Sequence, residues 1–136
     1  MSKLAVSYGP EHGDEPVVVS TTAELDALLG EVRAAYVERW PVQLEVTLAD
    51  DPVSCGLDVG LRGEVGVLFY SGDDYPDGCY SVGGASAGTP KTYYFYRNNR
   101  EYPANAEVSS AEVDSAVREF MERGGVRPSA VRWQDA

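Results

Sequence analysis

Two stretches of the chain carry hydrophobic residues at the three- and four-residue spacing of an amphipathic helix. The first follows Thr21 and Glu24, which have the spacing of a capping box, with a hydroxyl at the N-cap and a carboxylate three residues later. Pro41 predicts the end of this helix near Arg39 or Trp40, because the residue before a proline avoids helical backbone angles. Its hydrophobic stripe consists of Leu25, Leu28, Leu29, Val32 and Tyr36.

The second helical stretch begins with the same spacing, Ser109 followed by Glu112. Gly124 and Gly125 predict its end, because a left-handed residue at a helix terminus is easiest for glycine. Its stripe consists of Val113, Ala116, Val117, Phe120 and Met121.

Elsewhere, hydrophobic and polar residues alternate in short runs, which is typical of half-buried β-strands. The clearest run is 42–48, and residues 62–64 are short enough for a hairpin turn into the run that follows. Asn98 and Asn99 predict another turn, and 83–90 predicts a loop. We expect further strands at 4–8, 57–61, 65–70, 79–82, 92–96 and, as an edge strand, 129–133.

Strands that follow one another in runs favour an α+β fold. We expect a single domain over residues 1–136, built as one mainly antiparallel β-sheet with two α-helices packed on one face. The other face would then be free to meet solvent or a partner. In the aromatic run 93–96, Tyr93 and Phe95 point one way and Tyr94 and Tyr96 the other. One pair is expected in the core under the helices and the other on the open face, as ordinary surface or as a binding platform.

The hydrophobic runs are short, and Val17–Val19 is one of the longest. A transmembrane helix needs about 20 such residues, and the N-terminal run turns polar by Ser7, which is too early for a signal peptide. These patterns predict a cytoplasmic protein without a membrane span.

Acidic residues outnumber basic ones by 22 to 11, giving a formal net charge of −11. Direct binding to nucleic acid or to an anionic membrane is disfavoured, because both attract clustered lysine and arginine. Residues 41–80 hold eight carboxylates and a single arginine, Arg62. The excess charge is either a solvated surface or a surface complementary to a basic partner.

Residues for catalysis or for a metal are scarce in this sequence. His12 is the sole histidine and is expected in a loop as a solvated side chain, while Cys55 and Cys79 are expected to be reduced and partly buried. The glycine-rich segment 83–88 lacks the lysine and hydroxyl of a phosphate loop, and 73–78 lacks the ligand pattern of a calcium loop. We therefore expect no enzyme activity, no cofactor and no metal.

The segment around Tyr75 combines carboxylates, an aromatic ring and a proline. It is either a solvated turn or an acidic loop that binds a protein partner, since tyrosine is a frequent interface anchor. The candidate partner-binding residues are Asp73, Asp74, Tyr75 and Asp77, with Asp50 and Asp51 as a weaker second set. Two other functions stay open, namely a small-molecule or peptide binding domain that uses the open sheet face and an enzyme that uses carboxylates alone.

Several segments together, from about Leu25 to Trp133, resemble a known family. They are the strand-rich block 60–70, Tyr80–Gly83, Tyr93–Tyr96, Glu101–Pro103, Gly125–Pro128 and Val131–Trp133. The pattern resembles the immunity proteins of bacterial polymorphic toxin systems, in particular the first-catalogued immunity family, which is paired with deaminase toxins. The resemblance implies a non-catalytic protein that binds and neutralises a cognate toxin, and a toxin that acts on nucleic acid needs a basic surface.

Overall fold

The computed structural model describes residues 2–84 and 88–136. The N-terminal part contains β1 (Leu4–Ser7), a short 3-10 helix (Pro10–His12), β2 (Val17–Val19) and α1 (Thr22–Tyr36). The middle contains β3 (Val42–Leu48), β4 (Asp51–Arg62), β5 (Val65–Gly72) and β6 (Tyr75–Val82). The C-terminal part contains β7 (Lys91–Phe95), β8 (Asn98–Tyr102), β9 (Val108–Ser109), α2 (Ser110–Glu122) and β10 (Arg132–Asp135).

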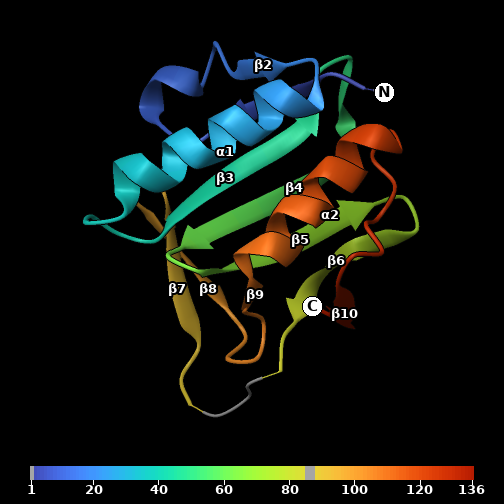
Figure 1. The fold of residues 1–136 in the computed structure, drawn as a ribbon. Helices are drawn as coiled ribbons and strands as arrows, with labels where there is room; N and C mark the ends of the chain where they lie inside the picture. Colours follow the sequence, from blue (N-terminus) through green and yellow to red (C-terminus); the bar gives the residue numbers. More distant parts are fainter. Residues whose placement is uncertain (1, 85–87) are drawn as a thin grey trace.

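All strands belong to one sheet with the main order β10-β6-β5-β4-β3-β1-β2. Strands β3 to β6 form consecutive antiparallel hairpins, and β7 joins β3 through one parallel pair, Val42 with Tyr94. Both helices lie across one face of this sheet (Figure 1). The predicted α+β fold, a mainly antiparallel sheet with two helices on one face, is confirmed.

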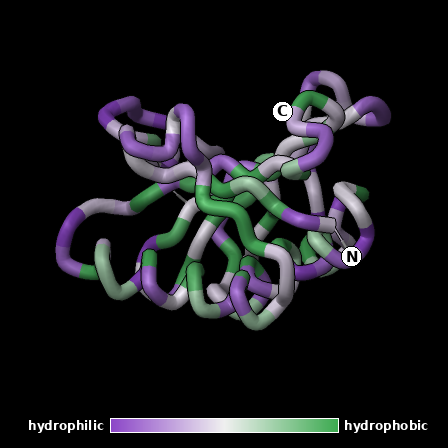
Figure 2. The backbone as a smooth tube through the Cα atoms, turned by 90° about the horizontal axis from the view of Figure 1, so that it is seen from above, coloured by the Kyte–Doolittle hydropathy of each residue, from purple (hydrophilic) through white to green (hydrophobic). Residues whose placement is uncertain are grey.

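The helices form where the sequence predicted, because both capping boxes are made. The hydroxyl of Thr21 accepts a hydrogen bond from the Glu24 amide, and that of Ser109 accepts one from the Glu112 amide, each at 3.1 Å. The first helix ends at Tyr36, slightly earlier than Pro41 suggested. The predicted stripes are buried against the strands, apart from the half-buried Tyr36. In Figure 2 the hydrophobic segments accordingly gather in the middle of the molecule and hydrophilic loops surround them.

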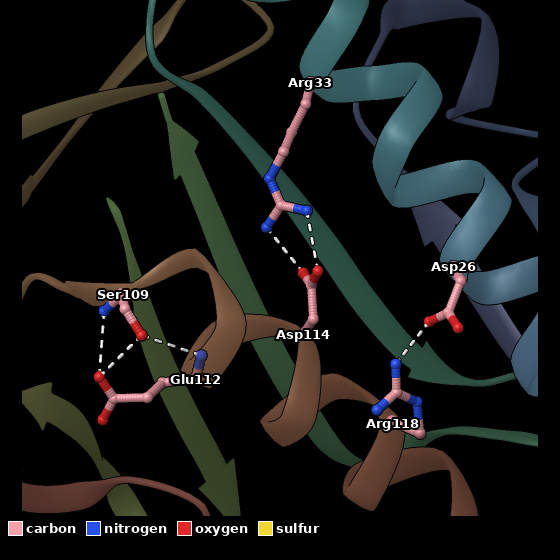
Figure 3. A network of polar contacts seen from close by, with 6 residues as sticks. All are labelled: Asp26, Arg33, Ser109, Glu112, Asp114 and Arg118. Carbon is pink, nitrogen blue, oxygen red and sulfur yellow. Dashed lines mark hydrogen bonds and ion pairs between the residues drawn. The ribbon is translucent and has the colours of Figure 1, made fainter. Parts of the chain in front are cut away.

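Two ion pairs join the helices (Figure 3). Arg33 of α1 forms a bidentate pair with Asp114 of α2, with N–O distances of 2.7 and 3.0 Å. Two turns earlier on α1 and one turn later on α2, Arg118 of α2 donates to Asp26 of α1 at 2.9 Å. The helices are therefore held side by side by charge as well as by their shared hydrophobic face.

The prediction of a free second face was wrong for part of the sheet, because the β7–β8 hairpin packs on that face. Tyr93 and Tyr102 of the hairpin are buried with Val67 and Ala106 in a second hydrophobic cluster. A side chain at Gly60 would have its Cβ 2.6 Å from the Tyr93 ring, so the glycine allows the hairpin to pack this closely on the sheet. The pair Tyr93 and Phe95 is buried, but Tyr93 lies between the hairpin and the second face of the sheet and not under the helices.

Other strand boundaries also differ from the sequence-based expectation. The turn predicted at Asn98 and Asn99 is wrong, because these residues begin β8 and the two-residue turn lies two residues earlier, at Tyr96 and Arg97, where Tyr96 has a positive φ of 57°. Strand β2 was not predicted, and β10 occupies Arg132–Asp135, where it is an edge strand as expected. The expected loop 83–90 includes residues 85–87, which lie outside the described residues.

Candidate functional site

The candidate residues lie in two hairpin turns and at the start of the strands that follow them, and the antiparallel strand order brings both turns to the same end of the sheet. Strands β3 and β5 run toward this end and β4 runs away from it (Figure 1). Leu48 pairs with Asp51 and Gly72 with Tyr75, so each turn has two residues. We call the exposed carboxylates at this end the acidic rim, which consists of Asp50, Asp51, Asp73, Asp74 and Asp77.

The acidic rim borders two surface hollows of mixed chemistry. One, of about 450 Å³, lies between the turns and includes Asp73, Pro76 and Val53, whose side chain is 92% exposed. The other, of about 440 Å³, is lined by Asp73, Asp74 and Tyr75 together with Arg123 and Arg127. Negative charge, a fully exposed hydrophobic side chain and an aromatic ring therefore lie close together.

Tyr75 is fixed by contacts that the sequence did not suggest. The Arg127 guanidinium lies 4.0 Å from the centre of its ring, a cation–π contact, and the Tyr70 ring packs on it edge to face at 6.1 Å. Arg127 also lies 5.7 Å from the ring of Trp133. The half-buried Tyr75 is consequently held in one position beside Asp73 and Asp74.

The aspartates of the acidic rim form no ion pair with an arginine among the described residues of the protein. In the part of the chain that the structure describes, the ion pairs of carboxylates with arginines involve Asp26, Glu45, Glu107, Asp114 and Glu119, and none involves a rim aspartate. The rim carboxylates thus present their charge to solvent and to whatever approaches this end of the sheet.

A second group of acidic side chains, which the sequence analysis did not single out, lies on the face opposite the helices. Strand registry places Glu45 beside Asp58, Asp58 beside Phe69, and Phe69 beside Tyr80. Burial and the neighbouring Glu45 carboxylate raise the pKa of Asp58 to about 7, although Arg100 opposes this. One local signal marks Asp58, namely that a charged residue stands between Leu57 and Val59 in a strand, and alternation alone assigns such a residue to solvent.

The remaining polar candidates are structural. His12 was expected to be solvated, but it is buried, and its Nδ1 accepts hydrogen bonds from the amides of Tyr8 and Gly9 at 3.2 and 3.1 Å. Both cysteines are free thiols; Cys55 is half-buried, as expected, whereas Cys79 is fully buried. Within residues 2–84 and 88–136, no three histidine, cysteine or acidic side chains gather as a set of metal ligands.

Comparison with known families decides the assignment. The family model described as immunity protein Imm1 matches residues 13–135, nearly the whole chain. The chain belongs to the Imm1 family. Membership in Imm1 supports a role in toxin immunity and implies a toxin as the partner. A comparison with curated proteins found no significant match, and no helix in the described residues has both the length and the hydrophobicity to cross a membrane.

Proposed function

We propose that this Imm1 protein is a non-catalytic inhibitor that binds a cognate toxin in the cytoplasm. The toxin is a nucleic-acid deaminase with a basic surface, and the acidic rim meets that surface together with Tyr75. The gathering of five aspartates at one end of the sheet, three in two hairpin turns and two at the start of the strands that follow, carries this proposal. An enzyme that acts on nucleic acid needs positive charge where it binds phosphates, and an acidic inhibitor is complementary to that charge.

The chemistry at the rim supports contact with a protein. Protein interfaces combine polar edges with aromatic and hydrophobic anchors, and Val53 and Tyr75 lie beside the acidic rim as candidate anchors. Inhibition by covering a substrate-binding surface requires no catalytic group. The buried His12, whose Nδ1 is used by two backbone amides, fits this view.

The test measures inhibition of the cognate toxin domain, using deamination of a nucleic-acid substrate as the readout. The unchanged protein should abolish activity at a molar ratio near one, and alone it should convert no substrate. Replacing Asp73 and Asp74 together by Asn should weaken inhibition about tenfold or more while leaving the melting temperature unchanged, because charge-assisted contacts are lost at an exposed turn.

A matched control uses Asp14→Asn with Glu15→Gln. These two exposed acids are adjacent like Asp73 and Asp74, but they follow the end of β1 that is farthest from Leu48 and the rim. The control should inhibit as well as the parent. A parent protein that leaves the toxin active would contradict the proposed function, whereas equal inhibition by both double variants would remove the acidic rim from the contact.

A further inference from the structure

The second face of the sheet contains a small cavity beside the β7–β8 hairpin. Its volume is about 120 Å³, and it is lined by Gln43, Asp58, Phe69, Tyr80, Arg100 and Tyr102. Because one water occupies about 30 Å³ in the liquid, this space suits the end of one side chain and is too small for a nucleotide. Strand β4 has glycine on both sides of Asp58 on this face, at 56 and 60.

A buried side chain with an unsatisfied polar atom lines the base of the cavity. Gln43 is 0% exposed, and its Oε1 accepts a hydrogen bond from the Tyr102 hydroxyl at 2.7 Å. Its Nε2 has no partner among the described residues. A buried polar atom without a partner costs free energy, and a half-turn of the amide presents either end to the cavity, so Gln43 can satisfy an incoming donor or acceptor.

The charge around the cavity is acidic and only partly compensated. Asp58 faces Glu45 on β3, Tyr80 on β6, and Arg100, Glu101 and Tyr102 on β8. The cation that lines the cavity, Arg100, is exposed and pairs with Glu45, with 3.7 Å between its guanidinium nitrogen and the Glu45 carboxylate oxygen. Asp58 lies against a second carboxylate and beside aromatic rings, an arrangement that lowers the stability of the fold when Asp58 is ionised. Pairing with a cation from a binding partner would offset this cost, so Asp58 is a candidate functional group.

We propose that this cavity is a socket for one arginine side chain of the toxin. The inference rests on the proposed function and adds a second contact surface to the acidic rim. A guanidinium group pairs with a carboxylate through two parallel hydrogen bonds and stacks on aromatic faces, and the row Asp58, Phe69 and Tyr80 supplies both kinds of partner. Lysine fits less well, because its compact and strongly hydrated charge neither stacks nor pairs in this planar way.

Binding of a cation at Asp58 has a measurable pH signature. Asp58 is about half protonated at pH 7 in the free protein and must be ionised to pair with arginine. The toxin should therefore bind about tenfold more tightly at pH 8 than at pH 6, beyond any pH dependence of its own groups. Asp58→Asn should bind about tenfold or more weakly than the parent at pH 8, and this tenfold pH term should disappear.

The experiment is titration calorimetry of the parent, Asp58→Asn and the control Asp14→Asn with the toxin domain at pH 6 and pH 8. The control should reproduce both parent affinities, and thermal melts check that each variant is folded. If the parent binds and Asp58→Asn binds equally well at pH 8, the socket is wrong and the proposed function survives. If Asp58→Asn binds weakly but keeps the full pH dependence, the contact involves shape and not an arginine. If the parent does not bind, the proposed function fails and the socket fails with it.

Discussion

At the scale of the residue, Asp58 is held where its charged form is disfavoured. It lies between two buried hydrophobic residues of β4, on the face that the β7–β8 hairpin partly covers, and Glu45 is its neighbour on β3. Both burial and like charge stabilise the protonated carboxyl group. Ionisation of Asp58 therefore reduces the stability of the folded protein.

The stability of the protein depends on pH because Asp58 has different pKa values in the folded and unfolded states. The usual pKa of an aspartate is 3.8 and that of folded Asp58 is about 7, so between these values the folded protein keeps a proton that the unfolded chain has lost. The free energy of unfolding contributed by Asp58 falls as pH rises through this window and is constant above it. We predict that Asp58→Asn is more stable than the parent by about 2–4 kcal/mol at pH 8 and nearly equal at pH 4.

Urea denaturation at pH 4 and pH 8 measures this difference directly. The exposed Asp14→Asn is the control for a general effect of removing one negative charge. Equal stability of Asp58→Asn and the parent at pH 8 would show that Asp58 is hydrated and ionised without cost.

At the scale of the element, the two helices are joined by ion pairs of different exposure. The side chains of Arg33 and Asp114 are 23% and 32% exposed, whereas those of Arg118 and Asp26 are 38% and 51% exposed. Removing one member of a shielded, bidentate pair leaves its partner short of hydrogen bonds, but water replaces a lost partner at the surface.

Asp114→Asn should therefore lower the free energy of unfolding by about 1–3 kcal/mol, and Asp26→Asn by less than about 1 kcal/mol. Chemical denaturation at neutral pH measures both values. A double-mutant cycle with Arg33→Met isolates the pair energy of Arg33 with Asp114. Equal losses for the two aspartate variants would indicate that the inner pair is as well solvated as the outer one.

The elements that the sequence predicted are those whose signals are local. A capping box and a stripe specify each helix within about 15 residues, and alternation specifies β3. The first four residues of β8, 98–101, are all exposed, so no alternation marks that strand, and its pairing with β7 follows from the turn at Tyr96. The packing of the β7–β8 hairpin on the second face depends on β8, which the sequence pattern does not predict. The cavity at Asp58 depends on β8 as well.

The same distinction applies to the candidate site. The turn residues of the rim are acidic in the sequence itself, but their arrival at one end depends on the registers of the strands from β3 to β6. Contacts such as that of Arg127 with Tyr75 join distant parts of the chain and leave no local pattern. The types of residue in the site were predictable, and their spatial grouping was not.

At the scale of the whole molecule, a net charge of −11 and the gathered rim aspartates create a directional electric field. Asp58 pairs with Glu45 and Asp51 pairs with Leu48, three residues further along β3 and roughly 10 Å away at about 3.3 Å per residue, so one protein partner can contact both the rim and the second-face cavity.

We predict that association with the toxin slows by about tenfold or more when salt is raised from 0.05 to 0.5 M, since salt screens the attraction between exposed charges. The variant with Asp73→Asn and Asp74→Asn should associate more slowly at low salt and respond less to salt. Stopped-flow association rates measure both effects, and the variant with Asp14→Asn and Glu15→Gln tests for a contribution of net charge alone. A parent rate that is independent of salt would exclude steering by the rim.

The side chains in the two-residue turns of the acidic rim can change the chemistry of the surface without changing the stability of the fold. Aspartate is common in tight turns because its side chain can accept hydrogen bonds from the local backbone. Exposed turn residues can change without repacking the strands that they connect. A lineage that meets a new toxin can therefore alter charge and hydrophobicity at Asp50, Asp73 and Asp74 one substitution at a time while the sheet persists. Divergence within the family is consequently expected to be fastest at this end of the molecule and slowest in the strands beneath the helices.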